Sequence, residues 1–205
     1  MTNINKHNLI LDSLESLLEE KKLQNISVSE IAERAGISKG SIYYYFPSKD
    51  AIFNALIERS YKIPLETAKQ LAGQTDVPPF TRMAMLFQSC RNVSASFIRD
   101  NRTMETDSIQ EKVFIHHKYA NYIIKELKPE LTAIIKQGID LKEIHFDNPE
   151  ALAEIVLIIL IIKLDNTLIP DSEKDVEKIL KGLVSLLEKG TGIPTGTLQY
   201  LSIQS

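Results

Sequence analysis

The chain has 205 residues, 43% of them hydrophobic and 25% charged, a composition typical of a globular protein with a buried core. Its net charge of −3 excludes a polycation, so any nucleic-acid-binding surface must be local. One cysteine excludes an internal disulfide, and the longest apolar run, IVLIILII at 155–162, is far shorter than the roughly 18 residues of a membrane span. We therefore expect a soluble, cytoplasmic protein that does not span a membrane.

The N-terminal residues predict two helices in succession. Apolar side chains recur every three or four positions over about 4–22, as in an amphipathic helix. Ser27 is followed three residues later by Glu30, the capping-box pattern that begins a helix. This second helix is predicted over about 28–35, and Gly36 can adopt the left-handed conformation that ends it.

Two further helices follow after a short turn. Ser38 is a good N-cap for a helix over about 39–45, and Ser48 is one for a helix over about 49–62. Pro64 makes continuation of the latter helix unfavourable. A short helix, a turn with glycine and another short helix predict a helix-turn-helix within a compact three-helix unit.

The remainder of the chain predicts longer helices. Their expected ranges are about 64–72, 78–99, 104–126, 129–141, 149–168 and 172–189. The predicted fold class is therefore all-α, with an N-terminal helix-turn-helix unit at 1–48, a linking helix at about 49–62 and a larger helical domain at 63–205. The final residues, 190–205, are expected to form a tail that packs through Leu198, Tyr200 and Leu201.

The stretch AGISKGSIYYYFPSKDAIF, residues 35–53, places four aromatic residues in a row. On a helix, Ile42 and Phe46 share one side, which is predicted to face the core. Tyr43 and Tyr44 then face outward, next to Lys39. The aromatic run is therefore predicted to be divided between a buried and an exposed face.

The exposed face has the chemistry that binds DNA phosphates. Lys39 and Lys49 can neutralise phosphates, and serine and tyrosine hydroxyls can donate to phosphate oxygens. Gly40 lets another surface approach the backbone closely. Residues 34–49 carry three basic residues and no acidic one. DNA is the predicted partner, and the alternative is a surface helix whose aromatic side chains are half buried by their neighbours.

The segment SVSEIAERAGISKGSIYYYFPSKDAIF resembles the DNA-binding region of the TetR/AcrR family of bacterial transcriptional regulators. The Ala-Gly turn, Ser-x-Gly-Ser, Ile-Tyr-x-Tyr-Phe and Ser-Lys-Asp stand in the family's order and spacing. The match is tight over about 27–56 and extends to the preceding helix, while the rest resembles the family in length and helical texture. The resemblance implies a homodimer that binds a palindromic operator in double-stranded DNA, with the helix at about 38–45 in the major groove.

The resemblance also implies individual contacts. It implies base or groove contacts from Lys39, Gly40 and Ser41, and phosphate contacts from Tyr43, Tyr44, Lys49, Ser27 and Ser29. One feature departs from the family, because the first helix is acidic, with Asp12, Glu15, Glu19 and Glu20. We therefore expect few phosphate contacts and a modest salt dependence.

Two helices near the C-terminus are implied to form the dimer interface, at about 149–168 and 172–189. The residues support this independently, because ALAEIVLIILIIKL is apolar on every side and needs two packing partners. VEKILKGLVSLLEKG adds an apolar seam suited to helix pairing. The alternative is that these helices belong wholly to the core of one chain.

The middle helices, at about 78–141, are implied to enclose the pocket of an unknown small-molecule effector. The candidate lining residues are polar or polarisable residues on apolar faces: Cys90, His116, Tyr119, Tyr122 and Asn166. The predicted function is a repressor that a ligand releases from its operator. The alternative is a helix-turn-helix dimer without a small-molecule ligand, constitutive or controlled by a protein partner.

No motif predicts catalysis. The four histidines do not have the spacing of metal ligands, and phosphate-binding, dinucleotide-binding and nucleophile-elbow motifs do not occur. We therefore expect no enzyme activity, no catalytic residues, no metal and no cofactor.

Overall fold

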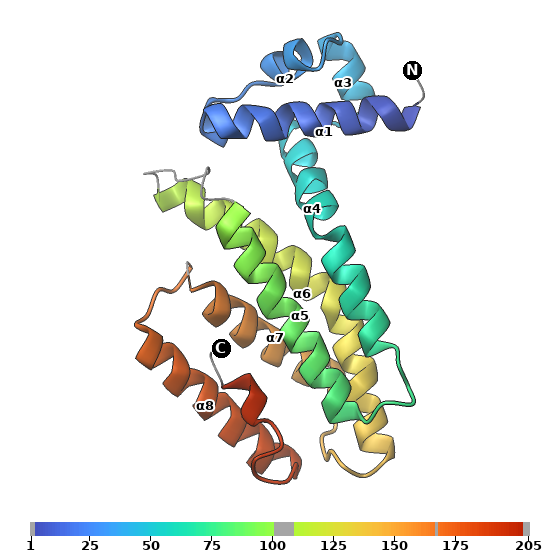
Figure 1. Ribbon diagram of the computed structural model, residues 1–205, viewed down its shortest axis with the longest axis vertical. Coiled ribbons are helices and arrows are strands. Elements are labelled where there is room, and N and C mark those ends of the chain that lie inside the picture. Colours follow the sequence, from blue (N-terminus) through green and yellow to red (C-terminus); the bar gives the residue numbers. More distant parts are fainter. Residues whose placement is uncertain (1–2, 101–108, 167, 203–205) are drawn as a thin grey trace. The chain divides into compact units, whose positions relative to one another are not determined.

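The computed structural model describes residues 3–100, 109–166 and 168–202, and every regular element within these ranges is helical (Figure 1). The all-α prediction is confirmed. Residue contacts divide the chain into two units. Unit 1 holds Met1–Lys62 and Arg99–Lys118, and unit 2 holds Ile63–Ile98 and Tyr119–Ser205.

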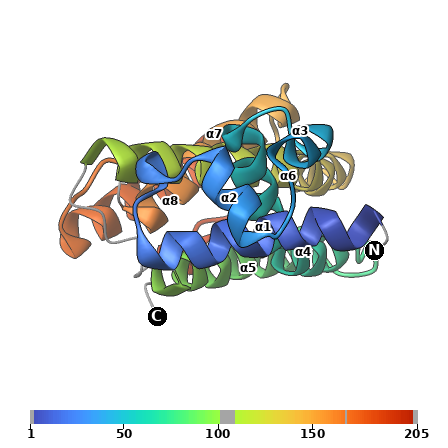
Figure 2. The same cartoon turned by 90° about the horizontal axis from the view of Figure 1, so that it is seen from above.

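Unit 1 contains the predicted helix-turn-helix. Its elements are α1 (Asn3–Glu20), η1 (Leu23–Asn25), α2 (Val28–Arg34), α3 (Lys39–Tyr45), the first part of α4 (Lys49–Ala72) and the first part of α6 (Ile109–Asp140). Helix α2 packs against both α1 and α3 (Figures 1 and 2). The core of this unit is formed by Ile10, Leu14, Ile31, Ile42 and Ile52, all of them fully buried.

The predicted caps of these short helices are confirmed. The Oγ of Ser27 accepts a hydrogen bond from the backbone N–H of Glu30, at 3.2 Å, and the Glu30 carboxylate accepts one from the N–H of Ser27, at 2.7 Å. Gly36 has a φ of +63°, the left-handed conformation that glycine adopts most readily. The Oγ of Ser38 accepts from the N–H of Ser41 at the start of α3.

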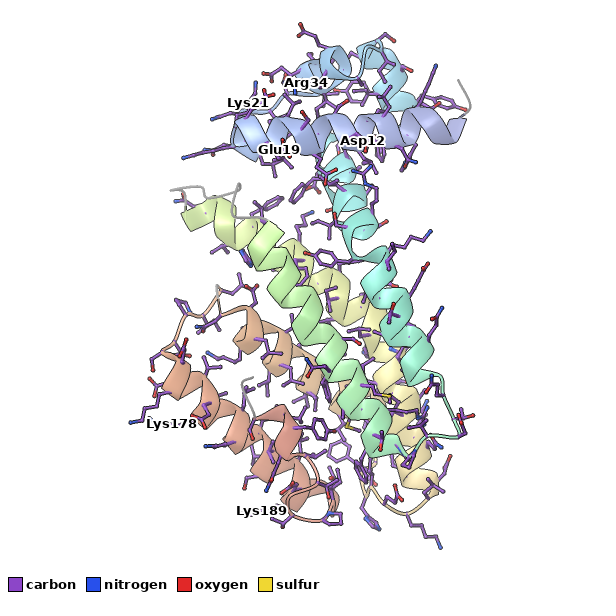
Figure 3. The ribbon with its side chains drawn as sticks, in the orientation of Figure 1. Asp12, Glu19, Lys21, Arg34, Lys178 and Lys189 are labelled. Atoms are coloured by element: carbon purple, nitrogen blue, oxygen red, sulfur yellow. The ribbon has the colours of Figure 1, made fainter. Side chains whose placement is uncertain are left out.

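The acidic side chains of α1 form ion pairs inside unit 1. Arg34 of α2 binds Glu20 at 2.7 Å, and Arg59 of α4 binds Asp12 at 2.5 Å and Glu15 at 2.7 Å. Asp12 and Arg34 are marked in Figure 3. These acids therefore join α1 to α2 and α4, which gives the negative charge of this helix a structural role.

Unit 2 is built from longer helices. They are the remainder of α4, most of α5 (Pro79–Asp100), the part of α6 that follows Lys118, α7 (Pro149–Asp165) and α8 (Glu173–Thr191), followed by η3 (Gln199–Leu201). Two predicted breaks are wrong, because α4 continues through position 64 and α6 continues through Pro129. A proline inside a helix costs about 3 kcal/mol. Buried residues on both sides of each position, Tyr61 and Leu65 in α4 and Leu127 and Leu131 in α6, offset that cost.

The C-terminal segment folds back onto α8. The carboxylate of Glu188, itself buried, accepts hydrogen bonds from the backbone N–H groups of Gly196 at 2.9 Å and Leu198 at 3.1 Å. Leu198 and Leu201 are buried and Tyr200 is half buried, and burial of its hydroxyl raises the pKa of Tyr200. The predicted packing of the tail through these residues is confirmed.

Candidate nucleic-acid interface

Helix α3 divides its aromatic residues between two faces. Ile42 and Phe46 are 0% and 5% exposed and belong to the core of unit 1. Tyr43 is 49% exposed and Tyr44 is 76% exposed. Tyr45 is half buried, and its ring meets that of Tyr44 edge-on, with centroids 5.1 Å apart. The predicted division of the aromatic run is confirmed, so the core does not account for Tyr43 and Tyr44.

Gly40 lies on the same exposed side of α3. Its φ is not positive, and a Cβ placed on it would meet no other atom within 4 Å. Neither backbone conformation nor packing within the chain therefore requires a glycine here, although alanine is a better helix former. Lys39 beside it is also exposed, and Ser41 is half buried. A glycine on an open helix face permits an external surface to approach the backbone closely.

The start of α2 presents two exposed serines, Ser27 and Ser29. The Ser27 Oγ acts as an acceptor in the helix cap, and its hydroxyl also donates to the Glu30 carboxylate. Glu30 in the same cap binds Lys21 at 2.5 Å. The hydrogen bond from Lys21, with those from the backbone and side chain of Ser27, lowers the pKa of Glu30 to about 2. The cap therefore keeps its charge at neutral pH.

Lys49 has an internal role that the sequence did not reveal. Its Nζ donates to the carbonyl oxygens of Leu23 and Ile26, each at 2.8 Å, and so holds the η1 turn that leads into α2. Arg34 is likewise bound to Glu20. Of the three cations between residues 34 and 49, Lys39 is the one that α3 itself presents to solvent. These partners lie 14 to 26 residues away in sequence, where local patterns carry no signal.

The structure does not gather the predicted ligand residues into one described pocket. The side chain of Cys90 lies outside the described part of the structure. His116 and Tyr122 are half buried in α6, and Tyr119 is 1% exposed. The Asn166 amide hydrogen-bonds to the backbone N–H and C=O of Asp171 and thereby closes the connection between α7 and α8.

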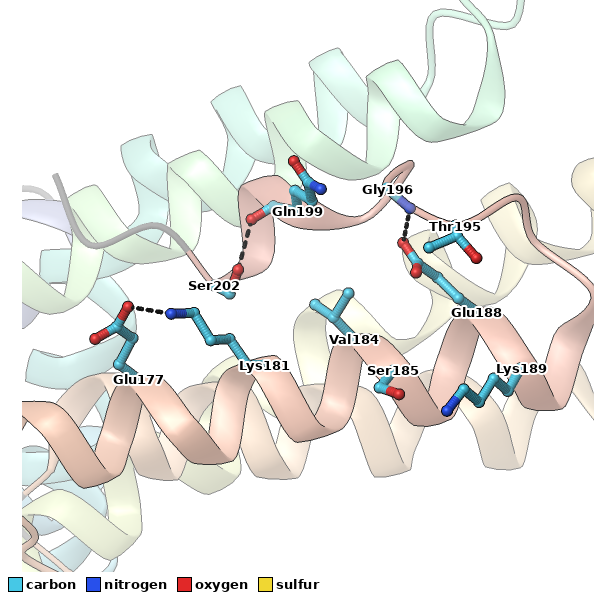
Figure 4. A pocket seen from close by; sticks show the side chains of 10 residues that line it. All are labelled: Glu177, Lys181, Val184, Ser185, Glu188, Lys189, Thr195, Gly196, Gln199 and Ser202. Atoms are coloured by element: carbon cyan, nitrogen blue, oxygen red, sulfur yellow. Dashed lines mark hydrogen bonds and ion pairs between the residues drawn. The ribbon is translucent and has the colours of Figure 1, made fainter.

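A cavity of about 690 Å³ lies between α8 and the C-terminal segment (Figure 4). Its walls are about equally polar and apolar and include Lys181, Val184 and Lys189 of α8 and Gln199 and Ser202 of the tail. The Lys181 ammonium binds Glu177 at 2.6 Å. None of the five predicted ligand residues lines this cavity.

Within the described ranges, no group of three His, Cys, Asp or Glu residues is placed to hold a metal ion. No helix there is both long enough and apolar enough to cross a lipid bilayer.

Residues 10–56 match the family model described as bacterial regulatory proteins, tetR family. The segment is similar to the HTH-type transcriptional regulator EthR of Mycobacterium tuberculosis, with 40% identity over 70 residues, 33% of this chain and 32% of EthR. It is also similar to the uncharacterised regulator YvdT of Bacillus subtilis, with 35% identity over 72 residues, 35% of this chain and 37% of YvdT. The chain thus matches about a third of the length of these curated relatives, both of which are named as HTH-type transcriptional regulators.

The similarity to solved structures extends over nearly the whole chain. RolR in complex with resorcinol superposes with a TM-score of 0.63 at 16% identity, covering 98% of this chain and 94% of RolR. SmeT, the repressor of a Stenotrophomonas maltophilia multidrug efflux pump, gives 0.61 at 15% identity, covering 93% and 92%. At such identities the likeness concerns the fold. The helix-turn-helix segment thus matches the tetR family of bacterial regulatory proteins, and the fold of the chain is like that of solved TetR-family structures.

Proposed function

We propose that the protein is a transcriptional repressor that acts in the cytoplasm, binds a palindromic operator as a homodimer and is released by a small-molecule effector. The observation that carries the DNA-binding part is the exposed face of α3, where Lys39, Gly40, Tyr43 and Tyr44 lie together with no role in the core. Ser41 would contact the groove beside them, and Ser29 of α2 would donate to phosphate oxygens, whereas the Ser27 hydroxyl serves the helix cap.

Lys49 has a different place in this proposal. Two of its three ammonium donors hold the carbonyls of Leu23 and Ile26, so it can offer one donor to a phosphate. Its larger effect would come from fixing the turn before α2. With Lys39 as the main phosphate contact in each half of a dimer, the slope of log K against log salt would be near −2, at about −0.9 per phosphate.

The homodimer is supported by an apolar face on α7 and α8. Ile155 and Ile158 of α7 are 50% and 39% exposed, although the opposite side of this helix is buried. Ile179 and Leu186 of α8 are 37% and 73% exposed and lie one heptad apart. Gly182 lies between them with open space at its Cβ position, which allows a second helix to come close. An apolar face of this kind suits a two-fold, self-complementary interface.

The proposal of a small-molecule effector rests on similarity of fold to other regulators. RolR has been solved with resorcinol and SmeT is the repressor of an efflux pump, and both share this fold. A ligand would shift the spacing of the two α3 helices away from the roughly 34–36 Å separation of half-sites on B-DNA. Cys90, His116, Tyr119 and Tyr122 stay candidates for the pocket, whereas the amide of Asn166 is occupied by its turn.

The test is a titration of labelled DNA from upstream of the protein's own gene, followed by fluorescence anisotropy at two salt concentrations. A scrambled duplex of the same composition is the control. We expect tighter binding to the native duplex, and a loss of about tenfold or more in Tyr44→Ala, since this exposed side chain can be removed without disturbing the core. Equal affinity of Tyr44→Ala and wild type for the native duplex would refute the assignment of the α3 face.

A further inference from the structure

A smaller cavity lies wholly within unit 1, where three segments of the chain meet. Its volume is about 320 Å³, at the lower end of the range for small-molecule sites. The lining comes from the η1 turn, the first turns of α4 and the first turns of α6. The residues are Leu23, Gln24, Lys49, Asp50, Phe53, Gln110 and Phe114.

The walls of this cavity are mainly apolar and aromatic. Leu23 and Phe53 are buried, whereas Phe114 is 40% exposed. The ring centroids of Phe53 and Phe114 are 6.3 Å apart and the two rings are inclined by 22°. An exposed ring held in a fixed orientation offers a stacking surface to a second flat ring.

The charged groups at the rim already have partners. The Lys118 ammonium lies 2.7 Å from the Asp50 carboxylate and 5.3 Å from the centroid of the Phe114 ring. Lys49 donates to two backbone carbonyls, which leaves its third N–H able to donate into the cavity that it lines. A cationic ligand would find no unpaired carboxylate here, because Asp50 is bound to Lys118. The mainly apolar lining penalises the burial of any charge, so the site favours a neutral ligand with an acceptor oxygen for Lys49.

We propose that this cavity binds a small, neutral, flat aromatic molecule with one carbonyl or hydroxyl oxygen. The ring stacks on Phe114, and the oxygen accepts a hydrogen bond from the third N–H of Lys49, the donor that would otherwise reach a DNA phosphate. The site goes beyond the proposed function, because its residues belong to the unit that carries α2 and α3. The ligand would touch both the η1 turn before α2 and the first turn of α4, and would stabilise unit 1 by mass action.

The test uses 6-propionyl-2-dimethylaminonaphthalene, a neutral, flat ketone whose fluorescence depends on its surroundings. It is titrated into the full-length wild type, Phe114→Ala and Val113→Ala. Phe114 and Val113 are adjacent and equally exposed, at 40% and 41%, but only Phe114 lines the cavity. We expect Phe114→Ala to weaken binding about tenfold and Val113→Ala to leave it unchanged. The same affinity in all three proteins would overturn the proposal.

A second measurement locates the ligand independently of affinity. The chain contains no tryptophan, so Phe114→Trp provides a single reporter in the cavity and Phe146→Trp provides one at an exposed position of unit 2. We expect 2-acetylnaphthalene to protect the first variant, but not the second, from acrylamide quenching. 2-Ethylnaphthalene, which lacks the acceptor oxygen, should protect more weakly. Protection of both variants, or of neither, would refute the site.

DNA binding by the same proteins without probe separates the two proposals. If the wild type binds its duplex while Phe114→Ala retains full affinity for the ketone, the cavity proposal alone fails. If no duplex is bound while the ketone discriminates between Phe114→Ala and Val113→Ala, the proposed function alone fails.

Discussion

Replacement of Gly40 by alanine should raise stability and weaken DNA binding, two effects of opposite sign. The native φ suits any residue, and the added methyl group meets no atom within 4 Å. Alanine in place of glycine in a helix stabilises by about 0.5–1 kcal/mol, and the lower value applies because Gly40 lies in the first turn of the seven-residue helix α3. On DNA, the same methyl group would stand between α3 and the groove. A loss of at least about tenfold in affinity, or 1.4 kcal/mol, is expected.

Urea unfolding and operator titration of the same preparation measure the two effects. Ser60→Ala is the matched control, because it also replaces an exposed residue of a unit 1 helix by the best helix former. Stabilisation without any loss of DNA affinity would show that nothing approaches Gly40, and the close-approach argument would be wrong. A loss of stability in Gly40→Ala would instead refute the open environment on which the calculation rests.

Two further predictions concern the interface and the helix cap. Leu186→Glu should give monomers and weaken operator binding, whereas Leu141→Glu, the same change at an exposed leucine that belongs to neither α7 nor α8, should leave the dimer intact. Light scattering after size exclusion measures the mass of both variants, and two dimeric variants would contradict the interface. The pKa of Glu30 is about 2 in the folded protein, against an ordinary value of 4.5. The ionised carboxylate therefore contributes to the stability of the fold above about pH 4.5, and this contribution is lost as the pH falls towards 2. The melting temperature of wild type should therefore exceed that of Glu30→Gln at about pH 6 and approach it at about pH 3, and a gap that does not change with pH would exclude this role.

The features that the sequence predicted correctly are those that depend on residues three or four positions apart. The capping box of Ser27 and Glu30, the positive φ of Gly36 and the burial of Ile42 and Phe46 all follow from spacing within one helical turn. For the same reason, the range of α3 was predicted without error.

The predicted helix breaks at Pro64 and Pro129 are wrong. A sequence pattern shows only the local cost of a proline, whereas the continuity of α4 and α6 depends on packing partners that are distant in the chain. The grouping of Arg99–Lys118 with unit 1 also depends on contacts between segments far apart in the chain. Phe114 and Phe53, which form its aromatic contact, are 61 residues apart. No periodic pattern in α4 or α6 indicates such a pair. The cavity between them therefore could not be found from the sequence.

The positive charge of residues 34–49 illustrates the same limit for the site. Counted along the chain, Arg34, Lys39 and Lys49 form a patch of one sign. In the folded chain Arg34 neutralises Glu20 of the acidic α1, and Lys49 holds the carbonyls before α2. Two of the three cations thus stabilise the unit that presents the third. Most of the proposed recognition of DNA would therefore come from hydroxyl groups, tyrosine side chains and the open backbone at Gly40. These groups would position α3 on the DNA by direct contact more than by charge.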